Sequence, residues 1–401
     1  MGRLACQRRI GIHGMNEAMA SERGAIYMNE PASAWPKAPG VIEAVAGEMA
    51  LSPAVLTPGE VQDGDIRAEC RARLAALLGV PDPSRIVLTS GATQALDLAL
   101  SGLRLPRGTN VITSCAEHNS VLRPLYHLQE RGRIHLRILG LDPRGEIDQE
   151  AFDDALRGGV SVVVFTHASN VTGRVFDVAP LFLRAKAQGA ITLLNAAQSF
   201  GLVAVPAEEL HADLVAFSGH RGLRGPVGTG GLFVAPHLDL SPRSTGATGN
   251  GGRHSLQPAD MPIRLEPGIP NMPLLAGLCA ALKWWEKAGP DCAREAGRLC
   301  RRLRAGLRRM RGVQVFDGGR QGRCLPIVSF RLLVRAVQEV GKDLRQEFAI
   351  CCRAGLHCSP LIHKAIGSRP EGTVRLGVSG MNTEEEVEAA LAAVQVLAAR
   401  H

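Results

Sequence analysis

The chain has 401 residues, of which 45% are hydrophobic and 21% charged, as is typical of a globular protein with a sizeable core. No apolar run approaches the roughly 18 residues of a membrane span, and the amino terminus lacks the apolar segment of a signal peptide. These features exclude a membrane protein and predict a cytoplasmic one. The ten cysteines have no spacing typical of a zinc site or a disulfide framework, so we expect no metal and mostly reduced thiols.

Residues 1–24 are predicted to be a poorly ordered N-terminal extension. From residue 85 onward, runs rich in Val, Ile and Leu alternate with helical patterns. The predicted strands are 85–90, 110–114, 134–139, 161–169, 191–197 and 214–219, and the predicted helices are 92–103, 120–132 and 180–189. Continuous apolar strands that are each followed by a helix favour a mostly parallel sheet covered on both faces. We assign residues 25–290 to this large α/β domain.

The pattern changes after residue 290. Residues 293–312 carry leucines and arginines at helical spacing, which predicts an amphipathic helix with leucines inward and arginines outward. Strands at 313–316, 324–333 and 373–378 follow, with a helix around 343–351. A last helix begins at Thr383, where T-E-E-E forms a capping box, and its apolar stripe runs to Leu397. We expect residues 291–401 to form a small α+β domain.

The net charge of +8 raises the question of a nucleic-acid partner. Much of the positive charge lies in the helix at 293–312, without a nucleic-acid-binding motif or interleaved aromatic residues. A solvated helix face is the favoured interpretation. We therefore expect no nucleic-acid partner.

Polar side chains gather at the predicted strand ends. Gly91, Ala92 and Thr93 lie at a helix amino terminus, where free N–H groups and the helix dipole can bind a phosphate. The other strand ends carry His118, Asn170, Asn195, Gln198, Ser218, His220 and Arg221. The carboxyl ends of parallel strands meet at one crevice of a sheet, which is where ligands bind in α/β proteins. The sequence therefore predicts one site at this edge.

The order of these segments resembles the class V aminotransferases, and within them the cysteine desulfurase and selenocysteine lyase branch. The resemblance runs from Ala25 onward and is carried by EHNSVLRP, THASNVTG, FSGHRGLRGPVGTGGL, RAGLHC and NTEEE. It implies the PLP-dependent transferase fold of type I, with a mostly parallel seven-stranded sheet domain and a small α+β C-terminal domain. It also implies homodimers that depend on pyridoxal phosphate (PLP).

The resemblance assigns a role to each of these side chains. Ala92, Thr93, Ser218 and His220 would hold the cofactor phosphate, His118 would stack on the ring, and Asn170 and Gln198 would contact the ring hydroxyl or the substrate. Arg353 and Arg375 would bind the substrate carboxylate, for which a bidentate guanidinium is well suited. Cys358 stands where desulfurases keep the cysteine that takes sulfur from the substrate as a persulfide.

Three positions depart from the family pattern. Arg221 stands where the family has the lysine of S-G-H-K, whose neutral amine forms the internal aldimine; arginine stays protonated and cannot form it. Asn195 stands where an aspartate pairs with the pyridinium nitrogen and keeps the ring an electron sink. Ile269 also replaces a threonine that the family commonly directs at the partner subunit's phosphate.

These departures leave two interpretations open. The favoured one is a degenerate desulfurase-like protein without aldimine catalysis, which binds a small anionic or amino-acid ligand, or a partner, and PLP non-covalently at most. The alternative is an active enzyme: a PLP-dependent cysteine desulfurase or lyase, or a sulfur-transfer protein that uses Cys358 and passes sulfur to an acceptor protein. A cation near Cys358 would make its thiol nucleophilic. The sequence leaves open whether the chain is an enzyme.

Overall fold

A seven-stranded sheet forms the centre of the computed structural model, which describes residues 24–51, 65–248, 255–317 and 322–400. Its strands are β2 (Ile86–Thr89), β3 (Thr109–Ser114), β4 (Ile134–Leu139), β5 (Val162–Thr166), β6 (Ile191–Asn195), β7 (Leu214–Ser218) and β8 (Gly230–Val234). They lie in the order β2-β8-β7-β6-β5-β3-β4. Neighbours run parallel except at β8, which is antiparallel to both β2 and β7. The prediction of a mostly parallel seven-stranded sheet is confirmed.

Helices cover both faces of this sheet, because successive side chains of each buried strand point to opposite sides. In β5, Val162 and Val164 pack toward α4 (Ala92–Gly102) and α5 (Asn119–Glu130). Val163 and Phe165 pack toward the other face. That face is covered by α3 (Ile66–Leu78), α6 (Gln149–Arg157), α7 (Ala179–Ala187) and the first half of α8 (Met272–Arg309). Both faces are thus buried, as the apolar strands predict.

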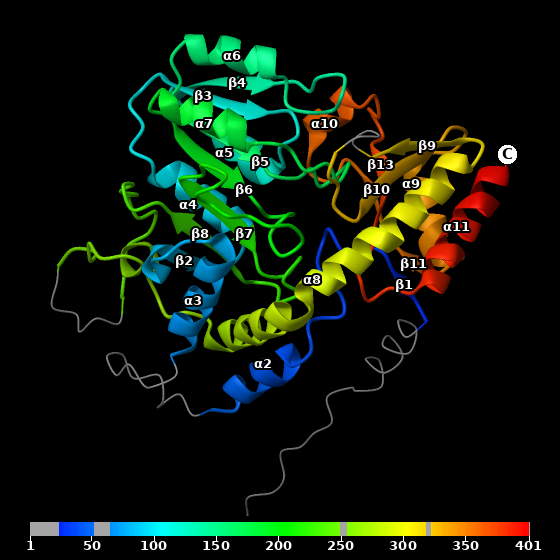
Figure 1. Ribbon diagram of the computed structural model, residues 1–401, viewed down its shortest axis with the longest axis horizontal. Helices are drawn as coiled ribbons and strands as arrows, with labels where there is room; N and C mark the ends of the chain where they lie inside the picture. The colour runs from blue at the N-terminus through cyan, green and yellow to red at the C-terminus, as the bar shows by residue number, and fades with distance from the viewer. Residues whose placement is uncertain (1–23, 52–64, 249–254, 318–321, 401) are drawn as a thin grey trace, which may run out of the picture.

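Helix α8 runs through two hydrophobic cores (Figure 1). It has 38 residues, so it is about 57 Å long. Leu278 packs in the core of the large sheet, whereas Leu299 and Leu303 pack in the C-terminal core. The predicted inward leucines of residues 293–312 are therefore confirmed, although the helix begins much earlier, at a cap formed by Asn271. The predicted domain boundary at residue 290 falls inside this helix.

The C-terminal part contains a second, antiparallel sheet of four strands in the order β12-β13-β10-β9. Its strands are β9 (Val313–Phe316), β10 (Ile327–Leu332), β12 (Arg353–Gly355) and β13 (Thr373–Gly377). Its helices are α9 (Val337–Gln346), α10 (Pro360–Ala365) and α11 (Glu384–Ala399). Thr383 and Glu386 form the predicted capping box at the start of α11. This is the α+β unit that the sequence predicts.

The helix predicted around residues 343–351 is wrong at its end. Helix α9 stops at Gln346, and Ala349 adopts a positive φ of 53° that turns the chain. The next residues form β11 (Ile350–Cys351), which pairs in parallel with β1 (Ile26–Tyr27). The apolar residues whose pattern predicted a longer helix thus belong to a strand, and the partner of this strand lies more than 300 residues away. The first described segment of the chain therefore joins the C-terminal part.

The remaining described elements are short. They are α2 (Val41–Met49), which packs on α8, and the 3-10 turns η2 (Pro83–Arg85) and η3 (Ile263–Leu265). The expectation of a poorly ordered N-terminal extension falls on residues 1–23, which lie outside the described ranges, and on Gly24. None of the helices in the described ranges is both long and apolar enough to cross a membrane.

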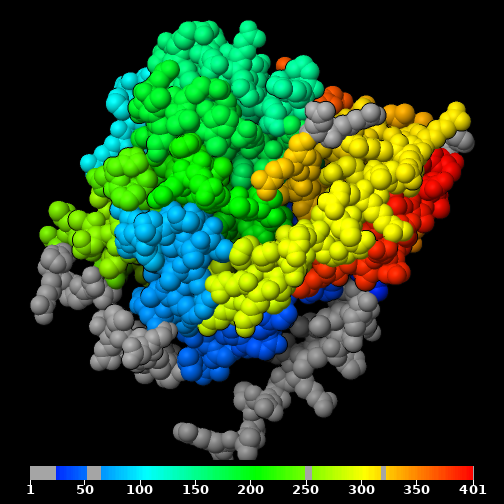
Figure 2. Space-filling view, in the orientation of Figure 1, coloured from blue at the N-terminus to red at the C-terminus, as the bar shows by residue number. Residues whose placement is uncertain are grey.

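Two bodies of the molecule meet along α8 in the space-filling view (Figure 2). The cyan and green surface of the large sheet domain lies on one side and the orange and red surface of the C-terminal part on the other, with yellow α8 running across both.

Across the described residues, no group of three or more His, Cys, Asp or Glu side chains could hold a metal ion. The nine described cysteines are all free thiols.

Candidate functional site

A cavity of about 150 Å³ opens at the carboxyl ends of the parallel strands. The prediction that the polar strand ends converge is confirmed, because nine of the predicted residues line this cavity. They are Ala92, Thr93, His118, Asn170, Asn195, Gln198, Ser218, His220 and Arg221. The other three do not line it: Arg375 donates to the carbonyl of the lining residue Asn170, whereas Cys358 contacts Asn119 and Arg353 contacts Cys358.

The first turn of α4 forms one end of the cavity. Gly91, the residue before the helix, has a φ of 145°, which only glycine adopts easily, and the Oγ of Ser218 accepts the Ala92 N–H at 3.4 Å. A side chain at Gly230 would lie 2.6 Å from the Gly91 Cα, so the backbone of β8 must approach the turn closely. The N–H group of Thr93 belongs to the first helical turn and has no partner within the helix. This end can bind an anion.

His118 presents a neutral ring to the cavity. It caps α5, and its Nδ1 accepts the Ser120 N–H at 3.0 Å, which assigns the ring proton to Nε2. Burial first, and then the charges of nearby arginines with Arg221 foremost, lower the pKa of His118 to about 4. His220 is also kept neutral, since burial, Arg221 and Lys37 bring its pKa to about 4.

Glu117 is a buried carboxyl group behind the cavity that sequence reasoning did not single out. Its Oε1 accepts hydrogen bonds from the Thr166 N–H at 2.5 Å and the Ser114 hydroxyl at 3.2 Å, whereas its Oε2 is buried without a partner. Burial raises the pKa of Glu117 to about 8, against the influence of its hydrogen bonds and of the nearby Asn195 amide. The only available signal was its place beside His118 at a strand end.

The loop that carries Cys358 is held in an unusual conformation. His357 and Cys358 both have positive φ angles, 50° and 59°, in the left-handed region that non-glycine residues rarely adopt. Such strain persists only where the surroundings fix it. The Asn170 amide donates to the His357 carbonyl at 2.8 Å, and the Asn119 N–H donates to the Cys358 carbonyl at 2.7 Å. Ser359 donates to the Asn170 Oδ1 at 2.7 Å.

These contacts change what Asn170 can do. Its side-chain oxygen and nitrogen are both occupied by the Cys358 loop. In the structure Asn170 therefore links the end of β5 to that loop. The resemblance predicts instead that Asn170 contacts a ligand. Gln198 is likewise held through its amide, which donates to the Pro31 carbonyl at 3.1 Å.

Three arginines surround this end of the site. Arg353 donates to the Cys358 Sγ at 3.3 Å. Arg375, which is 1% exposed, donates to the Asn170 carbonyl at 2.8 Å and to the Asn29 Oδ1 at 3.4 Å. Arg221 donates to the Ala197 carbonyl at 3.1 Å. None of the three has a carboxylate partner among the described residues.

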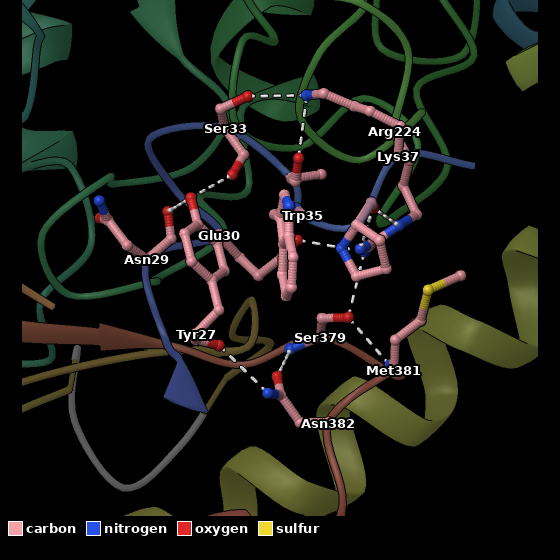
Figure 3. A network of polar contacts seen from close by, with 12 residues as sticks. Tyr27, Asn29, Glu30, Ser33, Trp35, Lys37, Arg224, Ser379, Met381 and Asn382 are labelled. Atoms are coloured by element: carbon pink, nitrogen blue, oxygen red, sulfur yellow. Dashed lines mark hydrogen bonds and ion pairs between the residues drawn. The ribbon is translucent and has the colours of Figure 1, made fainter. Parts of the chain in front are cut away.

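A polar network ties the N-terminal segment to both bodies of the molecule (Figure 3). Glu30 pairs with Arg224 at 3.2 Å, and Arg224 also donates to the Ser379 hydroxyl at 3.1 Å. The Asn382 amide donates to the Tyr27 carbonyl at 3.1 Å. Residues 27–37 thus link the large sheet domain to the C-terminal part, and the sequence alone did not indicate that Asn29 would contact Arg375.

None of the six lysines of the chain, all of which the structure describes, lines the cavity. Lys37 is the one whose charge is felt by a cavity residue, His220. Its Nζ is held by the Ser33 hydroxyl and the Ala34 carbonyl, each at 2.9 Å. Lys186 and Lys283 form ion pairs with Asp213 and Glu69. Arg221 is therefore the only long basic side chain among the residues that line this cavity.

Comparison with known proteins identifies the family. The chain matches the family model of class-V aminotransferases over residues 36–390. It is 30% identical over 330 residues to a probable cysteine desulfurase of Methanothermobacter thermautotrophicus, covering 80% of each chain. A probable cysteine desulfurase of Pseudomonas putida is 32% identical over 331 residues, covering 79% of each chain.

The fold is also that of solved desulfurase structures. The apo cysteine desulfurase from Thermococcus onnurineus NA1 superposes with a TM-score of 0.84 at 27% identity, covering 94% of this chain and 95% of that one. The cysteine desulfurase CsdA from Escherichia coli has a TM-score of 0.83 at 24% identity, covering 96% and 98%. These matches confirm the PLP-dependent transferase fold that the resemblance implies. The chain belongs to the class V aminotransferase family and is similar in sequence and fold to its cysteine desulfurases.

Proposed function

We propose that this chain is a sulfur-handling protein of the cysteine desulfurase type, in which Cys358 receives a sulfur atom as a persulfide. The contact between the Arg353 guanidinium and the Cys358 Sγ, at 3.3 Å, carries this proposal. The guanidinium N–H donates to the sulfur and so holds the thiol in a fixed position next to the site. The names of the similar proteins support the same activity rather than a protein that only binds.

The shape of the Cys358 loop supports a functional role. Backbone strain of about 1–3 kcal/mol at each left-handed residue is typical of active sites. Here the loop is fixed by Asn119 and Asn170, two residues at the ends of large-domain strands. Cys358 is partly exposed, so its thiol can meet a ligand.

The family implies pyridoxal phosphate as the cofactor. Several residues fit it: the first turn of α4 with Ser218 and His220 would hold the phosphate, and His118 would lie against the ring. When bound, the cofactor supplies an electron sink for bonds at the substrate α-carbon. No lysine lines the cavity to attach it covalently, so we infer non-covalent binding at most.

Sulfur transfer to Cys358 does not require covalent attachment of a cofactor. In the step we propose, the Cys358 thiolate attacks the outer sulfur of a small persulfide, R–S–SH. An S–S bond forms at Cys358, the S–S bond of the donor breaks, and R–SH leaves with the proton. The step converts the donor persulfide and the Cys358 thiol into a Cys358 persulfide and the donor thiol, so no oxidant or reductant is consumed. Arg375 and Arg353 would bind a carboxylate on the donor.

A second candidate function is ligand binding without turnover. Arg221 and Asn195 favour it, because the resemblance assigns a lysine and an aspartate to these positions. The unpaired guanidinium of Arg221 would then serve to hold an anion. Such a protein would bind its ligand equally well with or without the Cys358 thiol.

The two functions are separated by incubating the protein with cysteine persulfide and measuring the mass of the Cys358 peptide. We expect a gain of one sulfur atom on Cys358 in the wild type and none at this site in Cys358→Ser. Cys324→Ser is the matched control, since Cys324 is another partly exposed thiol, and it should leave the labelling of Cys358 unchanged. Wild-type protein that stays unlabelled at Cys358 would leave ligand binding as the function.

The assembly follows the family resemblance. We infer a homodimer in which the loop around Ile269 approaches the partner, and the 87% exposure of this apolar side chain supports that interface. Ile42, Met49 and Val227 are also exposed apolar side chains of the large domain. We further infer a sulfur-acceptor protein as the partner of the persulfide, and a cytoplasmic location. The division into domains at residue 290 is proposed on the change of sequence pattern there.

A further inference from the structure

The arginine side of the cavity carries more positive charge than the protein itself neutralises. Arg375 is buried and Arg221 is half-buried, and neither has a carboxylate partner among the described residues. The Nε atoms of both guanidinium groups are buried without a hydrogen-bond partner. A buried, unpaired charge is costly in a folded protein unless something compensates it.

The two guanidinium groups belong to different elements and face the same end of the site. Arg221 follows β7 and lines the cavity beside His118 and Gln198. Arg375 lies in β13 and bonds to the carbonyl of Asn170, which also lines the cavity. The charge of Arg221 acts on Arg375, and the charges of both act on His118, so the two groups lie around one space.

Apart from the Cys358 thiol, which acts on Arg375 and not on Arg221, the nearby groups do not supply the missing negative charge. Burial raises the pKa of Tyr27, near Arg375, to about 12, so it is neutral. Glu30 lines a second, smaller cavity on the other side of Arg221, but its carboxylate is paired with Arg224. Arg353 adds a third positive charge, although it is exposed and solvent screens it.

We propose that the site takes a small ligand with two acidic groups: a carboxylate at Arg375 and a second carboxylate, sulfinate or sulfonate at Arg221. This inference rests on the proposed function, because the ligand occupies the same cavity as the sulfur donor. A single carboxylate can form a bidentate pair with one guanidinium and leaves the other buried charge unpaired. Two acidic groups compensate both.

The test compares two amino acids of equal carbon number, L-aspartate and L-2-aminobutyrate, which differ by one carboxylate. Isothermal titration of the full-length protein in PLP-free buffer should give a dissociation constant for L-aspartate at least about tenfold lower than for L-2-aminobutyrate. In Arg221→Gln the ratio of the two constants should fall to near one. Arg221→Lys keeps a positive charge and should retain most of the ratio. Thermal melts of each variant check that it is folded.

The outcomes distinguish this inference from the proposed function. Equal affinities in the wild type, or no binding of either amino acid, would overturn it, as would a preference that survives in Arg221→Gln. The same titration in Cys358→Ser should keep the wild-type ratio, because the thiol is not part of the second acidic subsite. A retained ratio in a protein that fails to accept sulfur would support this inference while removing the proposed function.

Discussion

Polar groups on the two sides of the cavity are satisfied in different ways. On the sheet side, made by the first turn of α4 with His118, Asn195 and Ser218, each side chain has a protein partner. On the arginine side, made by Arg221, Arg353 and Arg375, buried guanidinium nitrogens remain unpaired.

The difference separates structure from ligand binding. A paired group stabilises the geometry of the empty site, because its hydrogen bonds exist before any ligand arrives. An unpaired buried charge destabilises the empty site and becomes favourable only when an anion is bound. The paired groups of the sheet side therefore fix the cavity, and the arginine side adds a second place, beside the free N–H groups of the α4 turn, where ligand charge is recognised.

The largest effect is expected when the guanidinium of Arg221 is replaced by the amine of a lysine. The double variant Arg221→Lys/Asn195→Asp supplies an amine that can lose its proton and form an imine, together with a carboxylate that can pair with the cofactor ring. We expect sulfide release from cysteine with PLP to rise at least about 100-fold over wild type. It should vanish again when Cys358→Ala is added. Sodium borohydride should leave a pyridoxyl label on residue 221 of the double variant and on no residue of the wild type.

A single-substitution control checks that account. Arg221→Lys alone should give the label with little sulfide, since Asn195 cannot balance a protonated ring. Wild-type protein that releases sulfide as fast as the double variant would show that Arg221 does not limit the chemistry.

The sheet side has two exceptions: the His220 Nδ1 is unpaired, and so is the Oε2 of Glu117. Its folded pKa of about 8 lies above the ordinary 4.5, so the folded state keeps a proton that the unfolded state releases between these values. The stabilisation that this proton gives the folded state is present in full below pH 4.5 and is lost as the pH rises through 8. Glu117→Gln does not titrate.

We therefore expect the free energy of unfolding of Glu117→Gln, relative to that of the wild type, to increase by about 2–4 kcal/mol between pH 5 and pH 8. Urea denaturation at pH 5, 6.5 and 8 measures the difference, in which the contributions of the buried histidines cancel. A difference that does not change with pH would mean that Glu117 titrates normally in the folded protein.

Replacing one residue on each side should change stability in opposite directions. Arg221→Met removes an unpaired buried charge and should raise the free energy of unfolding by about 1–3 kcal/mol. Ser218→Ala removes the acceptor of the Ala92 N–H and should lower it by about 1 kcal/mol. Denaturant titration of both proteins without ligand measures this. If Arg221→Met is the less stable variant, the guanidinium has a compensating partner in the free protein.

The smallest effect links the two sides. Arg221 is the first charge, after burial, among the causes that lower the pKa of His118 to about 4. Arg221→Gln should raise the pKa of His118 by about half a unit to one unit. Nuclear magnetic resonance titration of the ring protons follows it, with His135 as an internal reference. An unchanged His118 pKa would place Arg221 too far away to share a ligand with it.

Much of this architecture follows from local sequence. The apolar runs of β5 and β6 predict buried parallel strands because both their faces must be covered, and the Thr383 capping box predicts the start of α11. The convergence of His118, Asn195 and Ser218 follows from the geometry of a parallel sheet, whose strand ends share one edge. The twofold role of α8 was missed, since a helix that spans two cores looks locally like two helices.

Tertiary structure alone decided how the charges are satisfied. Nothing near Asn170 in the sequence indicates that its side chain is used to hold the Cys358 loop, because the partners lie more than 180 residues away. The pairing of β11 with β1 and the contact of Asn29 with Arg375 are of the same kind. The sequence determines which groups are present at the strand ends. Whether each is paired, strained or left for a ligand depends on distant segments that only the folded chain brings together.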